Sequence, residues 1–154
     1  MKKLNILAIA VGSFLLAGCA TAPMTSASSD AEAKQFKPDP GMASIYIFRN
    51  FALETLGNAN DYKTMLDGRF TGVLAPGTYQ LLTVPPGEHV LSLAGSHEDK
   101  VTVEAGKNYF FKITYPVAMR LVFGDVFNFE SVSEEQGRKE ILNLRRAEAT
   151  SYYE

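Results

Sequence analysis

Few residues in this 154-residue chain could carry chemistry. The sequence contains one cysteine, Cys19, and two histidines, His89 and His97. A metal site would have to join both histidines with Glu98 or Asp99. However, His89 stands in a Pro-Gly-Glu-His turn and His97 in a polar loop, and turn chemistry accounts for both positions. We therefore predict no metal site and no cofactor.

Motifs for nucleophilic or phosphate chemistry are also missing from the sequence. No serine lies in a Gly-x-Ser-x-Gly motif between a strand and a helix, and no glycine-rich phosphate loop precedes a helix. The paired carboxylates at 98–99 and 134–135 fall in a loop and at a helix start, where solvation and the helix dipole explain them. We expect that the protein is not an enzyme. The net charge of −2, without a Lys/Arg cluster, also argues against nucleic-acid binding.

Cys19 could be a small buried hydrophobic residue, a nucleophile, a metal ligand or an attachment point. The neighbouring residues decide between these roles. Lys2 and Lys3 precede an apolar run over residues 4–16, which has the length of a signal-peptide core rather than of a membrane span. The segment LAGC (16–19) follows, and then the chain becomes polar. The alternative is a short buried helix that ends in a buried thiol. The charged start, the apolar run, the LAGC segment and the polar sequence after it stand in the order of an export signal, and we therefore favour that interpretation.

The LAGC segment resembles the lipobox of bacterial lipoproteins. The resemblance implies that a signal peptide, residues 1–18, is cleaved before Cys19. It also implies a diacylglycerol thioether on the sulfur and an acyl chain such as palmitate on the new amino terminus. Ala20, in place of an aspartate, favours the outer over the inner membrane, with the domain facing the periplasm. The first expected partner is therefore the membrane, which Cys19 would bind stably through two or three acyl chains.

Residues 20–41 are rich in Ala, Ser, Thr and Pro and show no apolar period. This composition predicts a flexible linker with a reach of about 25 Å. Residues 19–41 would then form the lipidated N-terminus and linker, and residues 42–154 the folded domain.

The remainder of the chain has the pattern of a mainly β protein. Short β-branched and aromatic stretches alternate with Gly, Pro and Asp turns, and Asp67-Gly68 is a two-residue type I′ hairpin signal. We predict an antiparallel β-sandwich of about seven to nine strands. The expected strands cover residues 43–49, 62–66, 69–74, 78–84, 88–94, 100–104, 108–115, 121–123 and 126–132.

One C-terminal α-helix is expected over residues 133–147. Ser133 and Gln136 have the spacing of a capping box, in which each side chain bonds to the other residue's backbone N–H. A narrow apolar stripe would pack this helix against one face or edge of the sandwich. The stripe consists of Ile141, Leu144 and Ala147.

The turn motifs from Leu66-Asp67-Gly68 through the Pro-Gly-Glu-His turn to Ala105-Gly106-Lys107 resemble a family of short bacterial lipoproteins known only as a domain of unknown function. They are similar more distantly to PEGA-type domains, which have a prealbumin-like sandwich. The resemblance covers about residues 42–132. It implies the architecture of the domain and a location in the cell envelope. The family has no agreed activity that could be carried over to this chain.

Six side chains are candidates for an interaction surface, because aromatic, methionine and arginine groups are enriched at interfaces. They are Arg49 at the end of the first strand, Phe51 and Leu53 in the loop over 50–61, and Tyr115, Met119 and Arg120 around Pro116. Two alternatives stay open. The loop could tuck its apolar groups under the sandwich, and Pro116 could simply break an edge strand.

Together these observations predict a lipid-anchored envelope lipoprotein that acts as a binding or structural adaptor module, with an envelope protein or a cell-wall component as its partner. The alternative is a carrier of a small apolar ligand, with a cavity between the sheets. Aromatic density at 109–111 and around residues 123–129 suggests that alternative.

Overall fold

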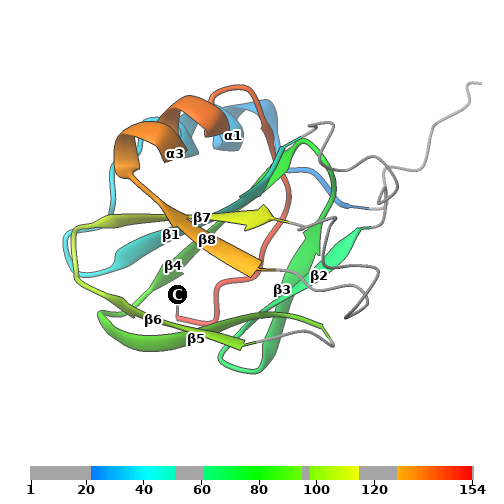
Figure 1. The fold of residues 1–154 in the computed structure, drawn as a ribbon. Coiled ribbons are helices and arrows are strands. Elements are labelled where there is room, and N and C mark those ends of the chain that lie inside the picture. Colours follow the sequence, from blue (N-terminus) through cyan, green and yellow to red (C-terminus); the bar gives the residue numbers. More distant parts are fainter. Residues whose placement is uncertain (1–21, 51–60, 95–97, 115–127, 154) are drawn as a thin grey trace, which may run out of the picture.

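The computed structural model describes residues 22–50, 61–94, 98–114 and 128–153. This part of the chain forms two β-sheets with two helices packed on one of them (Figure 1). The prediction of a mainly β sandwich with a C-terminal helix is confirmed. The strands are β1 (Ala43–Arg49), β2 (Tyr62–Leu66), β3 (Arg69–Leu74), β4 (Thr78–Val84), β5 (Gly87–Leu93), β6 (Glu98–Val103), β7 (Asn108–Thr114), β8 (Asn128–Val132) and β9 (Arg145–Arg146), and the helices are α1 (Ala27–Ala33) and α3 (Glu134–Ile141).

The strands are ordered β8-β7-β1-β4-β9 in one sheet and β3-β2-β5-β6 in the other. Two pairs, β1–β7 and β4–β9, are parallel, and the other described pairs are antiparallel. The five-stranded sheet is therefore mixed where we expected antiparallel strands throughout, and the four-stranded sheet is antiparallel as expected. The long connections between the partners of each parallel pair permit this arrangement, because parallel strands need a crossover of many residues.

The hairpin between β2 and β3 has the predicted turn. Asp67 and Gly68 have φ values of 50° and 73°, and Leu66 pairs with Arg69 across the turn. Positive φ at both central residues defines a type I′ turn, whose twist matches that of the strands. The hairpin therefore presents Asp67 at the tip of the four-stranded sheet.

Strand β1 is buried on both faces because it lies between two apolar layers. Ile45 and Ile47 belong to the cluster between the two sheets. Tyr46 and Phe48 belong to a second cluster, between the five-stranded sheet and the helices. Successive side chains of a strand point to opposite faces, so this one strand joins both cores.

Helix α3 begins as predicted and ends earlier than predicted. The Ser133 hydroxyl accepts a hydrogen bond from Gln136 N at 3.2 Å, but the Gln136 side chain donates to Glu140 instead of returning to the cap. The helix ends at Ile141, because the chain turns there and returns as β9 to pair with β4. Leu144 and Ala147 are buried, as expected of the stripe, but beyond the helix.

The segment expected to be a flexible linker is folded from residue 22 onward, which corrects that prediction. Helix α1 is capped by Ser26, whose hydroxyl accepts from Ser29 N at 3.2 Å. Ala22, Ala33 and Phe36 are 1%, 6% and 7% exposed. The composition of this segment is that of a linker, but distant parts of the chain supply the surface on which it packs.

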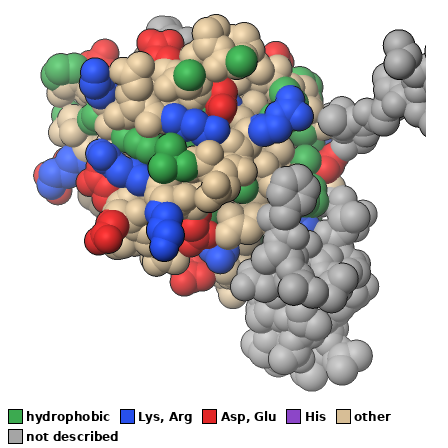
Figure 2. All heavy atoms as spheres, turned by 90° about the horizontal axis from the view of Figure 1, so that it is seen from above, with side chains coloured by type: hydrophobic (Ala, Val, Ile, Leu, Met, Phe, Trp, Pro, Cys, Tyr) green, Lys and Arg blue, Asp and Glu red, His purple; other side chains and the backbone are tan. Residues whose placement is uncertain are grey.

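Helices α1 and α3 lie on the outer face of the five-stranded sheet, and Figure 2 looks onto this layer. Acidic and basic side chains are interspersed there with small apolar groups. In the described ranges, the helices are too short and too polar to span a bilayer.

Candidate functional site

Residues 147–153, here called the C-terminal strap, connect the two sheets along one side of the sandwich. Ala147 N donates to Tyr79 O on β4, and Thr150 N donates to Thr71 O on β3, each at 2.8 Å. Between them, Ala149 forms a bridge with Gly72. In Figure 1 the strap is the red segment that runs down from the helices toward the β2–β3 hairpin. It covers the edge of the four-stranded sheet at β3.

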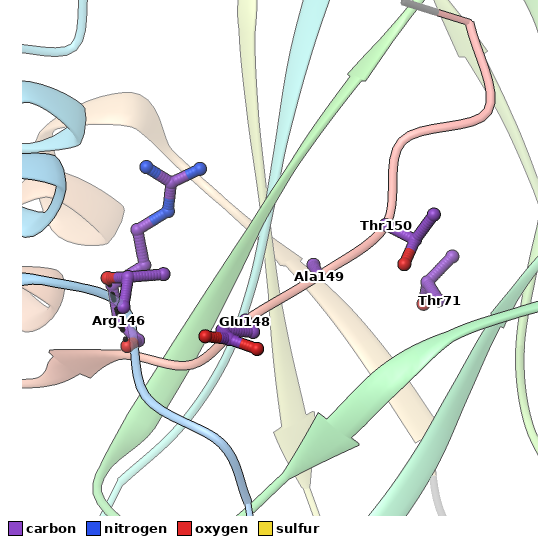
Figure 3. A pocket seen from close by; sticks show the side chains of 6 residues that line it. Thr71, Arg146, Glu148, Ala149 and Thr150 are labelled. Carbon is purple, nitrogen blue, oxygen red and sulfur yellow. Dashed lines mark hydrogen bonds between the residues drawn. The ribbon is translucent and has the colours of Figure 1, made fainter.

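The N-terminal segment lies along the beginning of the strap. Glu148 N donates to Pro23 O at 2.8 Å, Thr25 N donates to Arg146 O at 3.1 Å, and Met24 bridges Ala147. A hollow of about 280 Å³ opens beside these contacts. Its wall consists of Thr25, Thr71, Arg146, Glu148, Ala149 and Thr150, five of which are labelled in Figure 3.

Arg146 does not face the carboxylate of Glu148 in this hollow. Figure 3 shows its guanidinium pointing toward the helices, and one Nη donates to Ser29 O at 3.2 Å. This arginine therefore fastens α1 to β9 rather than offering a charge to a ligand.

The end of the strap meets His89 and Asp67. His89 Nδ1 lies 2.7 Å from Asp67 Oδ2, and His89 Nε2 lies 2.9 Å from Pro85 O. The hydroxyl of Tyr153 donates to the same Asp67 oxygen at 2.6 Å. A carboxylate and a carbonyl only accept hydrogen bonds, so the ring satisfies both partners when both of its nitrogens carry a proton. Because both nitrogens are occupied, His89 holds the fold together here and is not placed to act as a general base.

The same contacts shift the titration of Asp67. Burial pushes its pKa up, but the hydrogen bonds from Tyr153, His89 and Val90 N outweigh burial and hold the pKa below its ordinary value of 3.8. The carboxylate is therefore the ionised centre that joins the hairpin, β5 and the strap.

Four side chains, here called the aromatic patch, lie close to the contacts of Asp67. They are Arg69, Phe70, Tyr152 and Tyr153. Phe70, Tyr152 and Tyr153 are 47%, 39% and 38% exposed, which is high for aromatic rings. The Tyr152 hydroxyl donates to Phe70 O, and the Arg69 guanidinium lies 5.3 Å from the centroid of the Tyr152 ring. The patch combines exposed aromatic rings with an arginine, as interfaces do.

A second hollow, of about 550 Å³, lies between the start of α3 and the β6–β7 turn and is here called the α3 hollow. Two ion pairs edge it: Lys107 with Glu104 at 2.8 Å and Arg138 with Glu134 at 2.5 Å. Two buried atoms of its wall, Asn108 Oδ1 and Arg138 Nε, have no hydrogen-bond partner among the described residues. Unsatisfied buried polar atoms are costly and uncommon, which singles out this wall. Its lining consists of Phe36, Pro38, Glu104, Gly106, Lys107, Asn108, Tyr109, Glu134 and Arg138.

Of the predicted interaction residues, the structure describes Arg49. Its side chain is 3% exposed, and its guanidinium lies 4.2 Å from the centroid of the Tyr62 ring. Burial lowers the pKa of Arg49. The arginine is therefore part of the fold rather than an open cation on a surface. The other predicted positions, Cys19, Phe51, Leu53, Tyr115, Met119 and Arg120, lie outside the described residues.

The sequence did not reveal the aromatic patch or the α3 hollow. Arg69 and Phe70 are about eighty positions from the tyrosines that meet them, and only the strap brings these segments together. A local signal did exist, because two adjacent tyrosines, Tyr152 and Tyr153, stand directly before the last residue of the chain, Glu154. Of the two histidines considered for a metal site, His97 lies outside the described residues. Within the described ranges, no group of three or more His, Cys, Asp and Glu side chains could hold a metal ion.

These features define a class: a two-sheet β-sandwich with a helical layer, strapped along one side by its own C-terminus. The family model described as "Protein of unknown function (DUF2846)" matches residues 39–124, and the chain belongs to this family. An uncharacterized protein of Haemophilus influenzae is 34% identical over 152 residues, which cover 96% of this chain and 87% of that protein. No solved structure matches the chain significantly.

Proposed function

We propose that this protein is a lipid-anchored lipoprotein of the bacterial envelope, attached through Cys19 and working as a binding or adaptor module on the periplasmic side of the outer membrane. The anchor is supported by the charged start, the apolar core and the lipobox-like LAGC segment. The distant likeness to PEGA-type sandwiches is part of the same proposal, and it rests on the turn motifs alone.

The observation that carries the binding role is the α3 hollow. It is open, holds both signs of charge at its edge and has unsatisfied polar atoms in its wall. A wall of this kind fits a polar partner with donors and acceptors of its own, such as a peptide segment of an envelope protein. The residues most suited to chemistry, His89 and Asp67, are instead occupied by contacts inside the fold.

The position of the hollow also suits a partner on the periplasmic side. Asn108 pairs with Ser44 at the start of β1, whereas β9 and the N-terminal segment lie near the other end of β1, beside Tyr79. Ser44 and Phe48, which pairs with Tyr79, are separated by four residues of strand, or about 13 Å, and β7 and β9 lie on opposite sides of β1, three strand spacings apart. The hollow is therefore remote from the segment that leads to Cys19.

The carrier of a small apolar ligand is the weaker proposal. It requires a cavity between the sheets, and the inward-facing side chains of the two sheets form one continuous buried cluster. The hollows described above lie outside this cluster and have mixed polar linings. We therefore prefer the adaptor role.

The binding role can be tested with a photo-cross-linking amino acid placed at Lys107, on the edge of the α3 hollow. Lys63, exposed on β2, is the matched control position. Irradiation of intact cells is expected to give a reproducible adduct of one mass at position 107 and none at position 63. A normally lipidated protein that gives no adduct at position 107 would contradict the binding role.

The anchor is tested separately with Cys19→Ser. Without the thiol, lipid attachment and subsequent cleavage cannot occur, so the variant is expected to accumulate as a full-length precursor without labelled fatty acid. Normal processing with fatty acid still incorporated would contradict the assignment of Cys19.

A further inference from the structure

The fold leaves very little chain between Cys19 and the packed domain. Ala22 is 1% exposed, and Pro23, Met24 and Thr25 are bonded to the strap region. Three residues span at most about 10 Å when fully extended. If Cys19 carries lipid, as the proposed function holds, the sandwich is seated directly at the membrane surface rather than swinging on a linker.

The side of the sandwich held next to the membrane can be identified from the same contacts. Pro23 bonds to Glu148, and the strap continues from there to Tyr152 over four residues, about 13 Å of extended chain. The entry of the N-terminal segment and the aromatic patch therefore lie along one strap, on one side of the sandwich. The opposite edge of the four-stranded sheet is β6, three strand spacings from β3.

The chemistry of the patch fits the headgroup region of a bilayer. Tyrosine rings with one apolar and one polar end are enriched at membrane interfaces, where arginine is also favourable. The hydroxyls of Tyr152 and Tyr153 are bonded to Phe70 O and Asp67, while their rings stay more than a third exposed. The apolar ring of Phe70 beside them is about half exposed and has no polar group to keep in water.

We propose that the aromatic patch is a second membrane contact, which lays the strap side of the sandwich against phospholipid headgroups. This inference rests on the proposed lipid anchor. The anchor holds the patch at high effective concentration near the bilayer, so that a few rings suffice to fix the orientation. The domain then has one orientation, in which β6 faces away from the bilayer.

The chain contains no tryptophan, so a single introduced tryptophan is an unambiguous reporter of contact with lipid. The mature protein purified from membranes is reconstituted into vesicles of phosphatidylethanolamine and phosphatidylglycerol, with or without bromine on the acyl chains. Phe70→Trp and Tyr152→Trp report on the patch. Thr102→Trp, exposed on β6 of the same sheet, is the matched control.

Groups at the interface lie about 5–10 Å into the boundary between headgroups and acyl chains, so we expect bromine to reduce the emission of both patch reporters about twofold. The emission of Thr102→Trp is expected to stay unchanged. Circular dichroism of each variant verifies that it is folded, and the two patch reporters guard against an effect of one substitution.

The failure of the anchor and the failure of the patch give different results. A Cys19 peptide without acyl mass would overturn the anchor, and the membrane contact with it. An acylated, vesicle-bound protein whose patch reporters are not quenched would overturn the membrane contact alone and assign the patch to a protein partner. Equal quenching of Thr102→Trp would also overturn the proposed orientation.

Discussion

The hydroxyl of Tyr79 donates a hydrogen bond to Asp30 Oδ1 at 2.8 Å and so joins β4 to helix α1. The same carboxylate accepts from Lys34 Nζ at 2.7 Å and from Arg146 N at 3.1 Å. Burial raises the pKa of Asp30, but the hydrogen bonds from Lys34 and Tyr79 outweigh it and hold the pKa below its ordinary value. One ionised carboxylate therefore fastens α1 to β4 and β9, which is why the N-terminal segment is not a free linker.

Tyr79→Phe is expected to loosen α1, because the ring stays in place while the hydrogen bond to a charged group is lost. Such a bond contributes about 1.5–3 kcal/mol. We expect a loss of this size in the free energy of unfolding, measured with urea, and faster amide exchange in α1. Tyr109→Phe is the matched control, since its hydroxyl only accepts from Glu104 N in an exposed turn. Equal effects of the two variants would contradict the role given to Asp30.

The strands were predictable because their signals are local. The predicted ranges 43–49, 62–66, 69–74 and 78–84 coincide with β1 to β4, and the Asp67-Gly68 turn fixes the register of the hairpin. The seven residues of α1 carry no apolar period, and the groups that hold the helix are Tyr79 and Arg146, far along the chain. Sequence patterns report local preference, so this contact could not be read from them.

The candidate sites were less predictable than the fold for the same reason. Asp67 was recognisable as a turn residue, but its contacts with His89 and Tyr153 join positions 22 and 86 residues away. The end of helix α3 was predicted six residues too late, because the helix pattern of residues 142–147 competes with strand pairing to β4. In both cases a tertiary contact decides the outcome.

Gly137→Ala is expected to destabilise the protein even though alanine favours helix by about 1 kcal/mol. A Cβ at this position would overlap the ring of Phe110, because α3 packs directly on β7. Overpacking of this kind costs about 1–3 kcal/mol, which should appear in urea unfolding. Lys139→Ala, on the exposed side of α3, should change the free energy of unfolding by less than about 0.5 kcal/mol. A more stable Gly137→Ala variant would show that α3 can move off the sheet without cost.

Gly72→Ala is expected to displace the strap. A Cβ there would lie 2.6 Å from Gln80 Nε2 and 2.7 Å from Glu148 O, and the second atom belongs to the strap backbone. The strap must then shift, so we expect trypsin to cleave after Arg145 and Arg146 several-fold faster than in the wild type. Gly41→Ala is the control, since its Cβ would meet Asp39 at an ordinary contact distance of 3.5 Å. Unchanged cleavage in Gly72→Ala would mean that the strap is not held against β3.

Acid is expected to release the end of the strap by protonating Asp67. Because the pKa of Asp67 is lower in the folded protein than its ordinary value of 3.8, its contribution to stability is present above that value and is lost as pH falls through the folded pKa. Asp67→Asn keeps the positive φ of the turn, since Asn tolerates this conformation, and removes the charge. We expect the protection of the strap amides against exchange, taken relative to the intrinsic exchange rate at each pH, to fall below about pH 4 in the wild type and to depend less on pH in the variant.

Comparison of the wild type with Asp67→Asn distinguishes the acid response of the strap from that of the whole protein. Asp30 and Glu140 also have lowered pKa values, so the global stability of both proteins depends on acid. One titrating group changes the slope of stability against pH by at most about 1.4 kcal/mol per pH unit. The difference between wild type and Asp67→Asn should therefore stay within that limit and be confined to the strap and the β2–β3 hairpin. If the protection of the strap amides falls equally in both proteins, Asp67 is not the group that binds Tyr153 and His89 to the hairpin.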